Sequence, residues 1–128
     1  MPKKKIIRSE AAPKSVASYS HAVRAGKFVF CSGQIPLDPQ TGELVNGDIE
    51  EQTRRVLDNL GAVLAEAGLG YGDVVKCGVF LTDMNDFRAF DAAYAQYFGA
   101  EPPARSTVQV AGLPRGARIE IDAIALIR

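Results

Sequence analysis

Residues 118–127 predict a β-strand that is apolar on both of its sides over half its length. One side is apolar throughout and consists of Ile119, Ile121, Ala123, Ala125 and Ile127. The other side begins with Glu120 and Asp122 and becomes apolar at Ile124 and Leu126. The segment Asp73–Thr82 is also largely apolar on both sides, with one expected side formed by Val75, Cys77, Val79 and Leu81 and the other by Val74, Lys76, Gly78 and Phe80. A sheet made of such strands needs cover on both faces, because otherwise apolar surface stays in water.

The other patterns in the chain supply two helices for one face of this sheet. The expected order is a strand at Lys4–Arg8 with Ile6 and Ile7 inside, a hairpin at Ala22–Cys31, a helix after Asp48, a strand at Asp73–Thr82 and a helix after Asn85. A final hairpin is expected from the Arg105 strand, the turn at Leu113–Gly116 and residues 118–127. Two amphipathic helices can cover one face of a single sheet. We therefore expect an α+β fold, one domain over residues 1–128, and an oligomer formed through the open sheet face.

Capping residues mark the ends of both expected helices. Asp48 followed by Glu51 three residues later is typical of a helix N-terminus, and Gly68 is a natural C-terminal stop. For the second helix we expect Asn85 as the N-terminal cap and Gly99 as the end. The apolar face of that helix should contain Phe87, Phe90, Tyr94 and Tyr97 or Phe98.

Charge and composition narrow the choice of partners. The chain has 15 basic and 15 acidic residues and a formal net charge of zero, which argues against a nucleic-acid partner. The basic run Lys3–Lys5 is interpreted as the solvated edge of the first strand. A metal site is not expected, because His21 is the one histidine and Cys31 and Cys77 lie in apolar runs. No signal peptide and no bilayer-spanning stretch is expected, which favours the cytoplasm.

Arg105 is the first candidate for a binding residue. Pro102 and Pro103 stiffen the entry to its strand, because each proline fixes φ and lacks a backbone donor. Alternation places Arg105 with Thr107 and Gln109 on the polar side of this strand. A guanidinium held in this way suits a planar carboxylate, which it can grip through two parallel hydrogen bonds. The alternative is a surface arginine that pairs with a neighbouring acid.

Four motifs, in this order, resemble the RidA (YjgF) family of enamine/imine deaminases. They are Ser32–Pro36 after a hairpin, the helix from Gln52 onward, Ala104–Val108, and Arg118–Ala125. The resemblance runs from about Ala12 to the C-terminus. It implies a chorismate-mutase-like fold with two helices on one face of a single sheet, and a homotrimer with clefts between subunits. It also implies hydrolysis of 2-imino or 2-enamino acids to 2-oxo acids and ammonia without metal or organic cofactor.

The resemblance also assigns roles to individual residues. Arg105 matches the arginine that binds the substrate carboxylate, and Glu120 matches the acid associated with the attacking water. Tyr19 matches a tyrosine of the cleft, and Ser32, Gly33 and Gln34 match the loop beside it. Thr107 stands where many members have cysteine, and its backbone carbonyl is the implied partner of the substrate nitrogen. The chain departs from the pattern at Ala17–Ser18, usually Gly-Pro, and at Asp91, usually asparagine.

Several of these residues have a simpler structural interpretation. Glu120 could form an ion pair with Arg105 or Arg118, and Tyr19 could be an interface aromatic. Ser32 lacks a neighbouring base and a Gly-x-Ser-x-Gly motif, so we do not expect a serine nucleophile. His21 is interpreted as a surface or loop residue.

Three functions stay open from the sequence. The first is the deaminase. The second is a non-catalytic trimer that binds small 2-oxo or amino acids and regulates a partner, which the departures at Asp91 and Ala17–Ser18 would suit. The third is an endoribonuclease, an older label of the same family, and the zero net charge argues against it.

Overall fold

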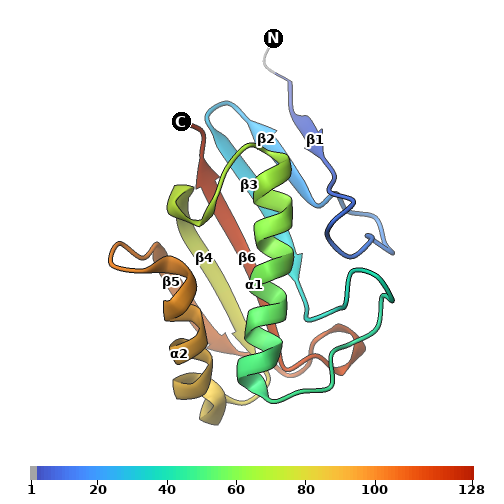
Figure 1. Cartoon of the computed structure of the whole chain (residues 1–128), viewed down its shortest axis with the longest axis vertical. Helices are drawn as coiled ribbons and strands as arrows, with labels where there is room; N and C mark the ends of the chain where they lie inside the picture. The colour runs from blue at the N-terminus through green and yellow to red at the C-terminus, as the bar shows by residue number, and fades with distance from the viewer. Residues whose placement is uncertain (1–2) are drawn as a thin grey trace.

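Residues 3–128, the part of the chain that the computed structural model describes, form one mixed sheet with two helices on one face (Figure 1). The helices are α1 (Ile49–Glu66) and α2 (Phe87–Phe98). The strands lie in the order β1-β2-β3-β6-β4-β5, with bounds β1 Lys5–Ile7, β2 Ala22–Ala25, β3 Phe28–Gln34, β4 Val74–Leu81, β5 Ala104–Gln109 and β6 Ile119–Leu126. Three single 3₁₀ turns complete the described elements: η1 Tyr71–Asp73, η2 Met84–Asp86 and η3 Pro114–Gly116. This confirms the α+β architecture expected from the sequence.

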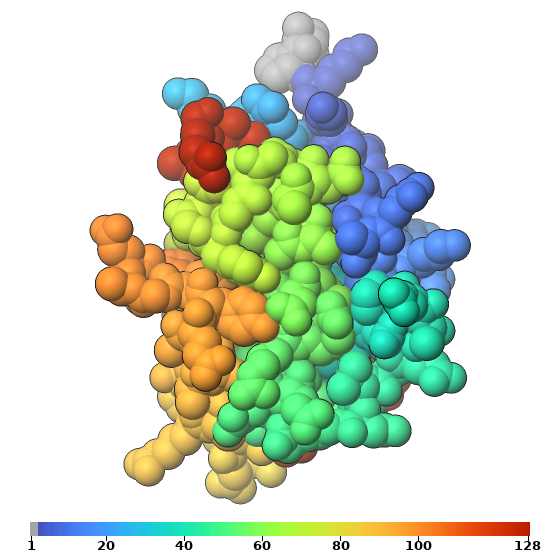
Figure 2. Space-filling view, in the orientation of Figure 1, coloured from blue at the N-terminus to red at the C-terminus, as the bar shows by residue number. Residues whose placement is uncertain are grey.

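The core lies between the helices and one face of the sheet. Helix α1 buries the face that its periodicity predicts, with Ile49, Thr53, Val56, Leu60, Val63 and Leu64. The sheet meets them with side chains from its central strands, including Val29, Val79, Leu81, Ile119 and Ile121, all fully buried. In the space-filling view α1 and α2 lie in front of the central strands, whereas the blue N-terminal segment stays visible beside α1 (Figure 2). Burial of each large aliphatic side chain contributes roughly 1.5–3 kcal/mol, so this layer stabilises the platform that carries the site.

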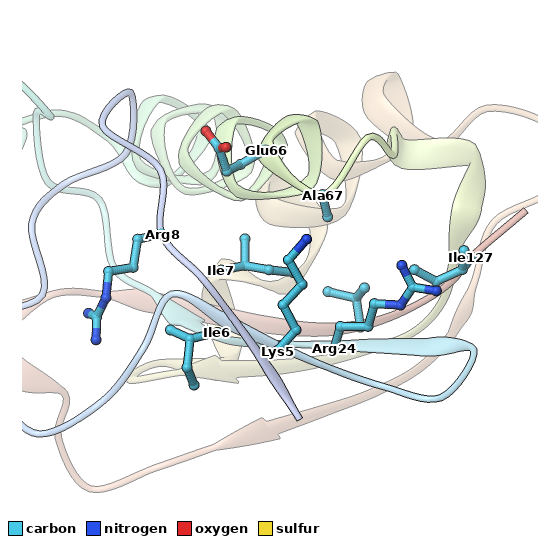
Figure 3. A pocket seen from close by; sticks show the side chains of 9 residues that line it. Lys5, Ile6, Ile7, Arg8, Arg24, Glu66, Ala67 and Ile127 are labelled. Carbon is cyan, nitrogen blue, oxygen red and sulfur yellow. The ribbon is translucent and has the colours of Figure 1, made fainter. Parts of the chain in front are cut away.

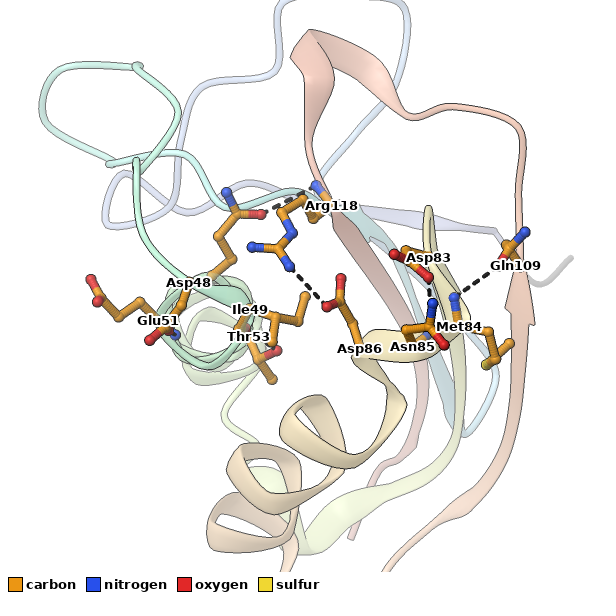
Figure 4. Close-up of polar contacts among 11 residues, drawn as sticks. Asp48, Ile49, Glu51, Thr53, Asp83, Met84, Asn85, Asp86, Gln109 and Arg118 are labelled. Atoms are coloured by element: carbon orange, nitrogen blue, oxygen red, sulfur yellow. Dashed lines mark hydrogen bonds and ion pairs between the residues drawn. The ribbon is translucent and has the colours of Figure 1, made fainter.

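Capping side chains mark the N-terminal ends of both helical segments. The cap of α1 is the expected one, and the cap before α2 is a different residue from the expected one. The Asp48 carboxylate accepts a hydrogen bond from the Glu51 backbone N–H at 2.9 Å, which confirms the N-terminus of α1. The prediction that Asn85 caps the second helix is wrong. Asp83 is the capping side chain, because its carboxylate accepts from the Asn85 N–H at 2.9 Å and starts η2, which leads into α2 at Phe87 (Figure 4). Asparagine and aspartate are equally good caps, so composition does not distinguish them.

Strand β5 pairs with β4, so the expected hairpin with residues 118–127 is wrong. The β4–β5 pair is parallel, with Cys77 opposite Arg105, whereas β6 runs antiparallel between β3 and β4. Helix α2 is the reason, because it carries the chain from the end of β4 back to the start of β5, and such a crossover gives parallel strands. Strand β5 is therefore the edge of the sheet, and η3 connects it to an interior strand.

Two local predictions of side-chain direction are also wrong. Val75 is exposed and Val74 is buried, because the β4–β6 register shifts between Val74 and Lys76. Such a bulge reverses the alternation that a regular strand would keep. Ile6 is exposed while Ile7 is buried, since β1 is a short edge strand and its neighbouring residues point to opposite faces.

The second face of the sheet carries large apolar side chains beside the acidic end of β6 and lacks a helix cover, as the sequence predicts. Strands β3 and β6 place Phe28, Phe30 and Leu126 on it, each more than 40% exposed. The Phe28 and Phe30 rings contact each other, with centroids 6.4 Å apart. Val108 adds apolar surface from β5. This surface is the feature that an oligomer would bury.

Candidate functional site

Strands β3 and β6 and the loop before β2 build the first half of the site. Glu120 of β6 lies on the open sheet face, since Ile119 and Ile121 on either side of it point into the core. A cavity of about 450 Å³ opens beside it. The cavity is lined by Pro13, Lys14, Val16, Ala17, Tyr19, Ser32, Gly33, Gln34, Ile35, Leu37, Pro114, Arg115 and Glu120. The structure thus brings together Tyr19, the end of β3 with Ser32, Gly33 and Gln34, and Glu120, which are five of the seven residues singled out from the sequence.

Gly33 is needed for the Glu120 carboxyl to lie where it does. A Cβ atom at position 33 would come within 2.7 Å of the Glu120 carboxyl carbon, closer than real Cβ atoms approach. The strand register shifts between Cys31 and Gln34, so Gly33 lies at an irregularity of the β3–β6 pair. The role of Gly33 is therefore close approach of backbone to an acidic side chain.

The pKa of Glu120 is raised above its ordinary value. Burial of the carboxyl is the larger cause, and the negative charge of Asp122 is the second. Asp122 lies two residues along β6 on the same face and accepts a hydrogen bond from the Gly78 N–H at 2.9 Å. A carboxylate with a raised pKa is a stronger base than an ordinary one, which suits proton transfer from water.

The structure places Ser32, Gly33 and Gln34 at the end of strand β3, so the expectation that they form a loop is wrong. Ser32 has a structural role there. Its hydroxyl donates to the Ser20 carbonyl at 2.6 Å, and its backbone N–H donates to the His21 carbonyl at 3.0 Å. These two bonds fasten the segment that carries Tyr19 to strand β3. The Tyr19 side chain itself is 44% exposed, so its ring is accessible from the cavity.

His21 lies in a loop, as expected, but it is buried and not at the surface. The Ser9 N–H donates to Nδ1 at 2.9 Å, and Nε2 lies 2.8 Å from the Pro13 carbonyl. The imidazole therefore accepts a hydrogen bond at Nδ1 and donates one at Nε2, which is the pattern of the tautomer with its proton on Nε2. Both nitrogens are occupied by backbone, so His21 holds residues 9–13 in place and has no free nitrogen for catalysis.

Arg105 lies in the second half of the site, on the helix side of β5. Its guanidinium carbon is 4.7 Å from the Tyr94 ring centroid, 5.0 Å from Phe90 and 5.5 Å from Phe87. Its Nη1 donates to Asp91 Oδ1 at 2.8 Å. The prediction that Arg105 sits on a polar side is therefore wrong. Arginine counts as a polar residue in the alternation of β5, but its side chain packs on the aromatic face of α2 and is largely shielded from water.

The two halves do not meet within one chain. Arg105 and Thr107 belong to the edge strand β5, and β4 separates it from the Glu120 strand. Arg105 faces the helices and Glu120 faces away from them. The expectation that these two residues become neighbours through a hairpin is wrong, because the strands do not pair. An ion pair between them in the same chain is excluded for the same reason.

Sequence reasoning does not identify two features of the site, the position of Arg115 and the aromatic contacts of Arg105. Arg115 lines the Glu120 cavity and has a φ of 62°, the one left-handed non-glycine residue within 3–128. The Leu113–Gly116 turn was the signal that could have pointed to it. The aromatic partners of Arg105 were recognised as a helix face but not as its contacts, since spacing does not reveal which side chain packs on that face.

A further cavity lies away from all of the predicted site residues. It has a volume of about 230 Å³ and lies between β1 and the C-terminal end of α1 (Figure 3). Lys5, Arg8 and Arg24 contribute cations to its lining and Glu66 an anion. Cations near a helix C-terminus interact favourably with the helix dipole, and this interaction explains the presence of Lys5, Arg8 and Arg24 here.

Neither a metal-binding cluster nor a membrane-spanning helix is found among the described residues. Within residues 3–128, no group of three or more histidine, cysteine, aspartate or glutamate side chains is placed to hold a metal ion. None of the described helices combines the length and the apolar character that crossing a membrane requires.

The structure defines an α+β subunit whose edge strand carries an anchored arginine and whose open face carries a glutamate over a glycine. The family described as endoribonuclease L-PSP matches residues 9–127, and the chain belongs to this family, the RidA (YjgF) family that the motifs indicate. The chain is 54% identical over 125 residues to protein DfrA of Myxococcus xanthus, covering 96% of this chain and 95% of that one. It is 45% identical over 123 residues to the 2-iminobutanoate/2-iminopropanoate deaminase of Mus musculus, covering 96% and 91%. The crystal structure of the YjgF gene product of E. coli superposes with a TM-score of 0.92 at 45% identity, covering 97% of this chain and 99% of that chain.

Proposed function

We propose that this protein is a homotrimeric deaminase that hydrolyses 2-imino and 2-enamino acids to 2-oxo acids and ammonia. The observation that carries the proposal is the pair of half-sites, an anchored arginine at one edge of the subunit and a glutamate with a raised pKa on the open face. A ligand can reach both groups when the open face of one subunit meets the edge strand of the next. The mouse relative is named for this type of reaction.

The proposed chemistry needs few groups. Arg105 binds the substrate carboxylate and fixes the orientation of the imine carbon, which is electrophilic once the nitrogen is protonated. Glu120 accepts a proton from water as the water oxygen bonds to that carbon. Proton transfer to nitrogen and cleavage of the C–N bond then release ammonia and leave the carbonyl of the 2-oxo acid. A 2-enamino acid enters the same path after protonation at carbon gives the imine.

The other residues shape the proposed cleft. Tyr19 offers a hydroxyl to the substrate, and Ser32, Gly33 and Gln34 form another part of the cavity lining. The Thr107 carbonyl is the proposed acceptor for the substrate nitrogen. The reaction as written consumes water and requires no metal or organic cofactor, and the proposed setting is the cytoplasm, with one domain per subunit.

The direct test is the release of 2-oxo acid from freshly generated 2-iminopropanoate. We expect Arg105→Ala to reduce the rate by about a hundredfold, because the substrate loses its anchor and its orientation. Arg128→Ala is the matched control, since it removes another arginine from a 2.8 Å pair with an aspartate, far from both half-sites. A wild-type rate no greater than the spontaneous rate would contradict the proposal, provided that the trimer is intact.

A non-catalytic regulatory trimer is the second candidate. The Asp91–Arg105 pair favours it, because a carboxylate ligand must share the guanidinium with Asp91. Tight binding of amino or 2-oxo acids without turnover of any imine would support this candidate. An endoribonuclease is the third, and balanced charge gives it little support.

A further inference from the structure

The Arg105 guanidinium is held rigidly by groups of helix α2. Three aromatic ring centroids lie within 5.5 Å of its central carbon, and Asp91 Oδ1 accepts a hydrogen bond from its Nη1 at 2.8 Å. The arginine side chain is only 20% exposed. A guanidinium fixed in this way presents the same edge to every ligand, so its selectivity depends on the charges placed beside it.

Asp91 is the charge beside it. Arg105 and Asp91 line one cavity of about 390 Å³, and they are the only charged side chains among the described residues that line it. The rest of the lining is apolar or aromatic and consists of Tyr94, Ala95, Phe98, Gly99, Pro102 and Pro103. The Asp91 side chain is 48% exposed, more than twice the exposure of its partner. The cavity therefore offers a cation and an accessible anion side by side, with no net charge.

We propose that Asp91 is a specificity-determining residue that makes the Arg105 anchor select carboxylates that also carry a cationic nitrogen. The ligand class is that of 2-ammonio and protonated 2-imino acids. Carboxylates without a cation, such as simple fatty acids and 2-oxo acids, are bound less well. This inference rests on the proposed function in one respect, since it takes Arg105 to be the group that binds the carboxylate.

Electrostatics gives the direction of this selectivity. A ligand carboxylate on Arg105 lies within a few ångströms of the Asp91 carboxylate, and like charges at that distance repel. A cationic nitrogen one carbon away from the ligand carboxylate offsets this repulsion, because it is attracted to Asp91. An overall neutral zwitterion therefore matches the cavity better than an anion does.

The selectivity has a consequence for the proposed reaction. The substrate carries its cation when the imine nitrogen is protonated, which is the reactive form. The 2-oxo acid product has lost that nitrogen and is a plain anion. Asp91 therefore favours retention of the reactive substrate and release of the product from the same anchor.

The test compares two probes of the same carbon skeleton, L-alanine and propanoate, which differ only in the ammonium group. Their dissociation constants are measured by calorimetric or NMR titration of the intact trimer at neutral pH and low salt. Asp91→Asn is the decisive variant, because the amide oxygen can still accept from Arg105 Nη1 while the charge is gone. Asp73→Asn is the matched control, since it removes the charge of the Arg128 partner outside this cavity.

We expect Asp91→Asn to bind propanoate more tightly and L-alanine more weakly than wild type does. The ratio of the two dissociation constants, which is the preference for L-alanine, should fall by about tenfold, as expected for charges a few ångströms apart at a partly solvated site. Asp73→Asn should leave the preference unchanged. An unchanged preference in Asp91→Asn, or no detectable binding of either probe to wild type and variant, overturns the inference.

A third variant separates this inference from the proposed function. If Arg105→Ala binds both probes as wild type does, Arg105 is not the anchor, and both proposals fail. If wild type hydrolyses 2-iminopropanoate and Arg105→Ala does not, while the preference of Asp91→Asn matches that of wild type, only the role of Asp91 is wrong. A purely structural ion pair would change the melting temperature of Asp91→Asn and leave the probe preference as it was.

Discussion

Arg105 and Glu120 lie on opposite faces of one sheet, with strand β4 between their strands. Arg105 packs on the aromatic residues of α2, whereas Glu120 lies over Gly33 on the open face. No side-chain motion within the subunit can bring the two groups to one small ligand, because the sheet itself stands between them. A site that uses both must take them from different subunits.

This separation predicts that two strongly impaired variants restore each other. Arg105→Ala and Glu120→Ala should each keep only about one per cent of the wild-type rate alone. Unfolded together in equal amounts and refolded, they should form mixed trimers in which about a quarter of the clefts combine an intact arginine with an intact glutamate, if assembly is random in a closed ring. We therefore expect about a quarter of the wild-type rate from the mixture, measured as 2-oxo acid release.

The control for this prediction is the same mixture without refolding. Preformed trimers that do not exchange subunits should keep the low rate of the single variants. A rate that stays as low after refolding, with trimers confirmed by light scattering, would show that the two residues do not serve one cleft.

Substitution of Gly33 by alanine should damage the site through Glu120. The new methyl group would collide with the Glu120 carboxyl, which must then rotate away from the cavity. A displacement of about 1 Å in a catalytic group can lower the rate by about a hundredfold. We expect a fall of this order in kcat for 2-iminopropanoate.

Gly112→Ala is the matched control for this glycine. A Cβ at that position has no atom within 4 Å, and its backbone is outside the left-handed region. The control should keep full activity. Equal activity of both variants would mean that the position of Glu120 does not matter for the rate.

The raised pKa of Glu120 predicts the acid limb of the pH profile. The base form is required, so activity is lost as pH falls through the pKa, which lies above the ordinary value of 4.5. Asp122→Asn removes the second cause of the shift while its amide oxygen can still accept from Gly78. The acid limb of kcat/KM should therefore move to lower pH in this variant. A limb that moves to higher pH, or does not move, would contradict the role of Glu120 as the base.

The spacing of apolar residues predicts the layers of the fold, because it shows which face of each helix and strand is buried. Helix α1 buries the face that its apolar spacing indicates, and Gly68 and Gly99 follow the two helices with positive φ angles, which glycine adopts readily. Alternation along residues 118–127 puts Leu126 on the second side of its strand, and that side chain is exposed on the open face. These features depend on local sequence and on the hydrophobic effect, which act the same way in every context.

Strand pairing and the partners of Arg105 depend on long-range order instead. Two strands linked by the turn at Leu113–Gly116 look like a hairpin, yet β6 inserts between β3 and β4. The side of β5 that carries Arg105 looks polar, but α2 covers it with aromatic rings. Spacing alone cannot tell whether an arginine faces water or packs flat on a ring.

The last prediction concerns His21, whose ring holds residues 9–13 against strand β2. Replacement by phenylalanine keeps the bulk of the ring and removes both hydrogen bonds, which leaves the Ser9 N–H and the Pro13 carbonyl without their partner. We expect a loss of about 2 kcal/mol in the free energy of unfolding, measured by urea denaturation, as is typical of buried polar groups left unpaired. KM for the imine should also rise, because the loop that continues from Pro13 to Tyr19 forms one wall of the Glu120 cavity. His21→Gln, which can both donate and accept, should recover part of the stability. A phenylalanine variant as stable as wild type would show that the two bonds do not hold the loop.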